Sequence, residues 1–212
     1  MKEIYTTVEN MAEAEIVEKR SRFIATVKPV STEEEALEFL NELRQRYWNA
    51  THNVYAYVIE ENNIMRYSDD GEPSGTAGVP VLDILKKEGL TNLIVVVTRY
   101  FGGVLLGTGG LVHAYSKSAK AGVEAAGLID IVLCRKITLR CEYTLLGKLQ
   151  NELMKWGNII QGEPVYTDKV ELSVCLPLQE CEGFQKSIID KTNANVVIVM
   201  GDTAYYSRKR EG

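Results

Sequence analysis

The hydrophobic pattern divides the first 130 residues into alternating short strands and helices. Phe23, Ala25 and Val27 alternate with polar residues, which is typical of a strand with one solvent-facing side. Apolar residues at helical spacing follow the capping sequence 31–35, which predicts an amphipathic helix. The pattern predicts strands at 12–19, 22–30, 52–60, 64–67 and 94–98, and helices at 31–48, 80–87 and 110–126.

The pattern restarts near residue 134 with a second set of elements. We expect strands at 135–143, 159–167, 169–176 and 195–206, and helices at 144–156 and 178–191. This βαββαβ order is the split βαβ arrangement of ferredoxin-like domains. We therefore predict an α+β protein with two domains, residues 1–133 and 134–212.

Two glycine-rich loops each lie between a predicted strand and a predicted helix. The first runs from Ser68 to Gly78 and is acidic, and the second follows the buried strand and Arg99. In the second loop, Thr108 stands where a P-loop needs lysine and Val112 where a dinucleotide fingerprint needs glycine. Two interpretations stay open: the backbone amides bind an anion, or the glycines only allow a tight chain path.

The charged residues beside these loops also have two interpretations each. Arg99 can clamp a phosphate or carboxylate, or it can pair with Asp69, Asp70 or Glu72. These three acids can hold a divalent cation, but capping of the turn and the next helix is the simpler interpretation. His52 can act as a base or be a structural donor.

The sequence contains no recognisable catalytic constellation. It has neither a G-x-S-x-G nor an S-x-x-K arrangement, and its two histidines and four scattered cysteines do not form a zinc motif. We expect no cofactor and no metal, and we favour a non-enzymatic protein. The predicted binding surface, for an anion or a partner, comprises His52, Asp69, Asp70, Glu72, Arg99, Gly102, Gly103, Gly107, Gly109 and Gly110.

Composition and charge narrow the class of protein. Hydrophobic residues make up 45% of the 212, enough for a normal core, and no apolar run is long enough for a membrane span. Charged residues occur throughout the first 19, which is not the pattern of a secretory signal peptide. We therefore expect a cytoplasmic protein with reduced cysteines. The net charge of −5 argues against non-specific coating of nucleic acid.

Four motifs resemble those of the IMPACT/YigZ family almost residue for residue. They are Lys19-x-Ser21-Arg22-Phe23-Ile24-Ala25, His52-Asn53, the acidic loop 68–80, and the segment from Thr98 to Leu111. The resemblance covers residues 15–127, and the remainder is similar to the short C-terminal domain of bacterial members.

This resemblance implies an N-terminal domain like domain IV of elongation factor G, and also like the second domain of a small-subunit ribosomal protein. It implies a C-terminal ferredoxin-like domain similar to domain V of that factor. The implied function is a non-catalytic, translation-associated role in contact with RNA, the ribosome or a translation-linked protein. Neither a membrane partner nor DNA specificity is expected. The alternative hypothesis is a phosphate-ligand-binding enzyme or sensor that uses both glycine-rich loops.

Overall fold

A computed structural model describes residues 2–157 and 159–210 of the chain. It combines helices and antiparallel sheets, which confirms the predicted α+β class. The chain forms two compact units, one built mainly from Tyr5–Asp130 and the other mainly from Ile131–Arg208. Strand β7 (Leu128–Cys141) starts in the first unit and continues into the second, so the predicted boundary at 133/134 falls inside a strand.

The first unit is organised around a five-stranded antiparallel sheet in the order β2-β3-β6-β4-β5. Strand β6 (Leu93–Tyr100) lies at its centre and is buried along its length except at Tyr100. Its β-branched residues suit a strand that is covered on both faces. The other strands are β2 (Ala12–Glu18), β3 (Ser21–Pro29), β4 (His52–Ile59) and β5 (Ile64–Ser68).

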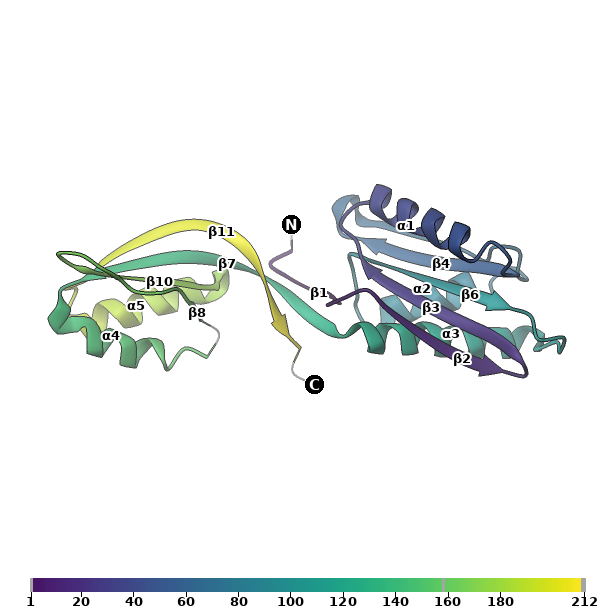
Figure 1. The fold of residues 1–212 in the computed structure, drawn as a ribbon. Helices are drawn as coiled ribbons and strands as arrows, with labels where there is room; N and C mark the ends of the chain where they lie inside the picture. The colour runs from purple at the N-terminus through teal and green to yellow at the C-terminus, as the bar shows by residue number, and fades with distance from the viewer. Residues whose placement is uncertain (1, 158, 211–212) are drawn as a thin grey trace. The chain divides into compact units, whose positions relative to one another are not determined.

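Helices cover both faces of this sheet (Figure 1). Helix α1 (Glu33–Arg46) packs Phe39, Leu40 and Leu43 against one face. Helices α2 (Gly78–Lys87) and α3 (Gly107–Ala126) cover the opposite face around Tyr115 and Val123. Gly122 lets α3 approach the sheet closely, because a Cβ there would lie 2.8 Å from that of Ala25.

The second unit has the element order βαβββαβ, which differs from the predicted βαββαβ in that one predicted strand is divided into two short ones. In its sheet β10 lies between β7 and β8 and also pairs with β9, while β7 also pairs with β11 and with β1 (Ile4–Val8). The elements after β7 are α4 (Leu146–Leu153), β8 (Ile160–Gln161), β9 (Val165–Tyr166), β10 (Val170–Pro177), α5 (Cys181–Thr192) and β11 (Val197–Lys209). A core around Phe184, Leu149 and Ile137 joins the two helices to the sheet.

Several predicted elements differ from the structure. The strand predicted at 159–167 is two short strands, because Pro164 has no amide hydrogen to donate and interrupts regular pairing between them. The helix predicted at 144–156 is preceded by a 3₁₀ turn at Tyr143–Leu145 and ends at Leu153. Strand β1 (Ile4–Val8) was not predicted, since the charged residues around it obscure any alternation.

Candidate functional site

The site lies where central strand β6 ends, and Arg99 is its organising residue. Arg99 pairs in register with Phe23 of β3 and His52 of β4. Its side chain is only 6% exposed. The guanidinium carbon lies 5.3 Å from the ring centre of Phe23 and 5.5 Å from that of Phe101, within the range of cation–π attraction. A cation at this depth requires an anionic partner.

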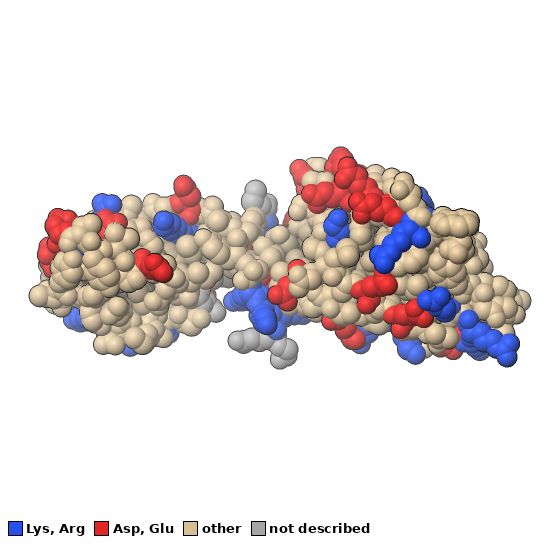
Figure 2. All heavy atoms as spheres, viewed as in Figure 1, with Lys and Arg blue, Asp and Glu red and all other residues tan. Residues whose placement is uncertain are grey.

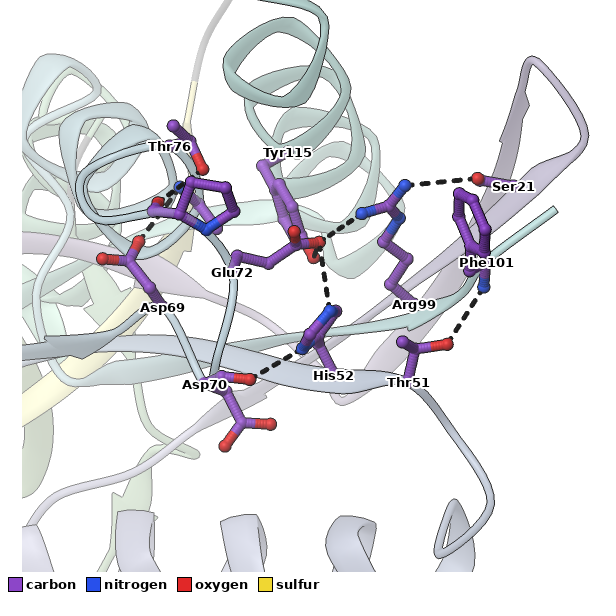
Figure 3. Close-up of polar contacts among 12 residues, drawn as sticks. Ser21, Thr51, His52, Asp69, Asp70, Glu72, Thr76, Arg99, Phe101 and Tyr115 are labelled. Atoms are coloured by element: carbon purple, nitrogen blue, oxygen red, sulfur yellow. Dashed lines mark hydrogen bonds and ion pairs between the residues drawn. The ribbon is translucent and has the colours of Figure 1, made fainter. Parts of the chain in front are cut away.

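Glu72 of the acidic loop supplies that partner (Figure 3). Its Oε1 accepts a hydrogen bond from Arg99 Nη1 at 2.5 Å, and its side chain is 4% exposed. Tyr115 of α3 donates its hydroxyl to the same oxygen at 2.7 Å. The sequence left open whether Arg99 pairs with Asp69, Asp70 or Glu72, or binds a ligand alone. In the structure Arg99 pairs with Glu72.

Tyr115 acts here as a fixed hydrogen-bond donor. Its ring is fully buried and meets the Phe23 ring edge-on at 5.2 Å between centres. Burial raises the pKa of Tyr115, and the neighbouring Glu72 carboxylate raises it further. The hydroxyl therefore stays protonated and stabilises the Glu72 carboxylate, which links α3 to the acidic loop.

His52 completes the cluster from β4. Its Nδ1 lies 2.8 Å from the backbone carbonyl oxygen of Asp70, and a carbonyl can only accept, so Nδ1 carries the hydrogen. Its Nε2 lies 3.8 Å from Glu72 Oε1, on the side of the ring that faces the cluster (Figure 3). The imidazole is thereby held with Nε2 directed toward Glu72.

The two aspartates of the acidic loop have structural partners. Asp69 accepts from the backbone amides of Gly75, Ala77 and Gly78 at 2.8–3.1 Å, using both carboxylate oxygens. It thus closes the loop and satisfies amides at the start of α2, which is the capping interpretation. Asp70 accepts from the Asn53 amide at 2.6 Å and pairs with Arg44 at 3.3 Å.

A cavity of about 400 Å³ opens beside this cluster. His52, Glu72 and Arg99 supply its charged and polar groups, together with Thr51 and Thr108. Its larger, apolar part is formed by Pro73, Phe101, Leu105, Leu106 and Leu111. Phe101 and Leu105 are exposed at 45% and 83%, so an apolar group that enters from solvent meets them first.

The glycines of the second loop have two different placements. Gly107, Gly109 and Gly110 lie within the first turn of α3, which starts three residues earlier than the sequence predicted. The first amides of a helix have no acceptor within it, and no side chain in the described part of the chain accepts from those of residues 107–109. Gly107 and Thr108 line the cavity, so this helix start faces it.

Gly102 serves close packing instead. A Cβ there would lie 2.1 Å from the carbonyl carbon and oxygen of Arg20, too close for any side chain. The Gly102 amide donates to Ser21 Oγ at 3.1 Å, and Arg99 Nη2 donates to the same oxygen at 3.4 Å. Gly103 follows with a positive φ of 82°. The loop is therefore fixed to the turn between β2 and β3.

Sequence reasoning did not identify Tyr115, Phe101, Thr51 or Ser21 as members of the site. One signal was present for Tyr115: it lies four residues after Leu111, so both face the same side of α3. Ser21 and Phe101 were visible only as parts of family motifs. The Thr51 hydroxyl oxygen accepts a hydrogen bond from the Phe101 amide at 3.1 Å. This contact links residues that are 50 positions apart in the sequence.

Together the fold and the site define an α+β protein with a buried charged cluster at the end of a central strand. The family profile "Impact N-terminal domain" matches residues 19–123, and "Domain of unknown function (DUF1949)" matches residues 139–195. "IMPACT family member YvyE" of Bacillus subtilis is 43% identical over 205 residues, 96% of this chain and 94% of the relative. The chain belongs to the IMPACT family.

Two further matches span most of both chains. "IMPACT family member YigZ" of Escherichia coli is 33% identical over 185 residues, 85% of this chain and 90% of the relative. A solved structure described as "Crystal structure of an hypothetical protein" matches with a TM-score of 0.60 and 29% identity, covering 94% of this chain and 98% of that one.

Two further findings bear on the class of protein. None of the helices described here is long and apolar enough to cross a membrane. All four cysteines are free thiols, and burial raises the pKa values of Cys134, Cys141 and Cys181. A raised pKa keeps these thiols protonated and poorly nucleophilic.

Proposed function

We propose that this protein binds RNA, in a translation-associated and non-catalytic role, by taking one unpaired nucleotide into the cavity. The observation that carries the proposal is the pairing of an exposed apolar wall with an open helix start in one cavity. Unpaired bases stack on aromatic side chains, and phosphates bind at helix N-termini. A cytoplasmic location and the ribosome as the source of RNA belong to the same proposal.

The cavity offers complementary groups to each part of a nucleotide. Phe101 and Leu105 provide the surface on which a base can stack. The amides at the start of α3 provide donors for a phosphate. Glu72 Oε1 is occupied by Arg99 and Tyr115, while no partner of Oε2 occurs among the described residues, so Oε2 can accept from a base amino group.

The charge distribution favours the binding of single-stranded RNA over the binding of duplex RNA. The chain carries a net charge of −5, and Figure 2 shows acidic side chains gathered over α1. Binding of a duplex depends on neutralisation of its phosphates by cationic side chains. An acidic surface therefore gives a duplex little binding free energy. A single strand can place a base in the cavity and gain from stacking as well.

Fluorescence anisotropy with a labelled single-stranded RNA tests the proposal. We expect saturable binding at low salt that weakens as salt rises, and weaker binding of the matched duplex. Phe101→Ala should weaken binding about fivefold or more, since base stacking contributes about 1–3 kcal/mol per base and 1.4 kcal/mol corresponds to a factor of ten. Tyr67→Ala is the matched control, because Tyr67 is a similarly exposed aromatic of β5 outside the cavity.

Two results would contradict this proposal. One is the absence of binding to single-stranded RNA at low salt. The other is equal loss of affinity in Phe101→Ala and Tyr67→Ala, which would place the RNA elsewhere on the surface.

A second candidate is the binding of a small phosphorylated ligand. The volume of about 400 Å³ favours it, since it lies within the usual range for small-molecule sites. Thermal-shift measurements with nucleotides and sugar phosphates distinguish the candidates. A ligand at 100 times its dissociation constant adds about 2.7 kcal/mol of stability, so an unchanged melting temperature across the set argues against this candidate.

A further inference from the structure

The turn between β2 and β3 has an unusual backbone. Glu18 pairs with Ser21 at the end of the hairpin, so Lys19 and Arg20 alone form the connecting loop. Their φ angles are 44° and 68°, both in the left-handed region. Two-residue hairpin loops of this kind strongly prefer Asn-Gly, because both positions need a positive φ, which Gly adopts freely and Asn adopts at a lower cost than Lys or Arg.

The chain thus carries two long cationic side chains at positions where Asn-Gly would be less strained. Strained backbone at a fixed position is a reason to look for function. Both residues are exposed, and neither makes a hydrogen bond or ion pair within the described part of the chain. Arg22, two residues further on, is instead paired with Glu15 at 2.9 Å.

The turn is attached to the rim of the cavity. The backbone of Arg20 packs directly on Gly102, the residue after Phe101. Ser21 accepts from the Gly102 amide and from the Arg99 guanidinium. Figure 2 shows lysine and arginine side chains gathered at the end of the first unit where β2 and β3 are joined.

We propose that Lys19 and Arg20 form a second contact site, for the phosphodiester backbone of RNA next to the nucleotide in the cavity. This inference rests on the proposed function, since it requires that RNA reaches the cavity. The chemistry is that of unpaired cations held beside a binding pocket, where each phosphate contact releases condensed counterions. The turn sets the position of these charges relative to Phe101.

The test replaces the turn with the sequence that its backbone prefers. Lys19→Asn/Arg20→Gly should raise the melting temperature or leave it unchanged, because the strain is relieved. The same variant should reduce the slope of log affinity against log salt by about 1.4, at about 0.7 for each single-strand phosphate contact. Lys19→Gln/Arg20→Gln keeps the Cβ atoms and should show the same change in slope without any gain in stability.

Lys86→Gln/Lys87→Gln is the control, since it removes two charges at the C-terminal end of α2, outside the cavity lining. An unchanged slope in both turn variants, with RNA still bound, overturns the inference and leaves the proposed function intact. Equal slope changes in the control overturn it as well. If the unmodified protein binds no single-stranded RNA, the proposed function fails and the inference fails with it. Salt-dependent binding of an acidic peptide instead of RNA also overturns it.

Discussion

Removing one member of the buried Arg99–Glu72 pair should destabilise the first unit strongly. Both side chains are at least 94% buried, and the pair is joined by a 2.5 Å hydrogen bond. Arg99→Met leaves the Glu72 carboxylate buried with only the Tyr115 hydroxyl as a close donor. An uncompensated buried charge of this kind costs about 3–5 kcal/mol, whereas an exposed pair contributes about 1 kcal/mol or less.

The pair can also be removed as a whole. Arg99→Met, Glu72→Met and Tyr115→Phe together eliminate both charges and the hydroxyl that donates to the carboxylate. Replacement of a buried ion pair by apolar side chains is often neutral or stabilising. We therefore expect the triple variant to be more stable than Arg99→Met alone. If the cluster serves binding rather than stability, this variant folds but loses affinity for RNA.

Hydrogen–deuterium exchange measured by mass spectrometry is the suitable assay, because it resolves the two units. Peptides from β6 report on the first unit, and peptides from β10 report on the second. A loss of about 3 kcal/mol should accelerate the slowest exchange of β6 by about 100-fold or more, since 1.4 kcal/mol corresponds to a factor of ten. Exchange in β10 should be unchanged.

An acceleration of β6 exchange by less than about fivefold in Arg99→Met would contradict a large cost of the unpaired carboxylate. The pair would then behave as a solvent-exposed one. A triple variant less stable than Arg99→Met would also contradict this expectation, because the loss of stability in Arg99→Met would then come from packing rather than from an unpaired charge.

Two further predictions concern other positions. Gly102→Ala should destabilise the protein by about 1–3 kcal/mol in urea unfolding, because its Cβ would collide with the Arg20 backbone. Gly109→Ala, a helical position with open space around it, should instead leave the stability unchanged or raise it by up to about 1 kcal/mol. Hydrogen bonds from Lys155 and then Ser187 lower the pKa of Glu152 below its usual 4.5. Its stabilising effect is thus present above pH 4.5 and lost as pH falls through the lowered pKa, so the stability difference between Glu152→Gln and the unmodified protein should shrink on acidification.

Sequence patterns predicted most elements of the first unit because its strands and helices have clear periods. The β-branched run at the centre of the chain indicated a buried strand, and the capping sequence 31–35 indicated where α1 begins; in the structure Thr32 is the N-cap and accepts from the Glu35 amide. The start of α3 was harder to predict from the sequence. A run of glycines has low helix propensity, so packing of the rest of α3 places Gly109 and Gly110 in a helical turn, while Gly107 begins the helix with a positive φ of 73°.

The candidate site was predictable only in part, for a related reason. The two loops carry recognisable residues, but the sequence left two interpretations of Arg99 open, an anion clamp or an ion pair with one of three acids, and the structure shows the pair with Glu72. Which acid it pairs with depends on the path of the acidic loop, and that path depends on Asp69 binding amides six to nine residues ahead. The contribution of Tyr115 depends on how α3 packs against β3, which no local pattern encodes.

The Asp69 contacts have a consequence for how a ligand is received. Because one carboxylate holds Gly75, Ala77 and Gly78 together, the loop that carries Glu72 is closed by contacts formed during folding. The entropy lost in ordering this loop is therefore not lost again on association. A ligand of the proposed kind would therefore meet a preorganised wall, and its selection would depend on the shape and donor pattern of the cavity rather than on adaptation of the loop.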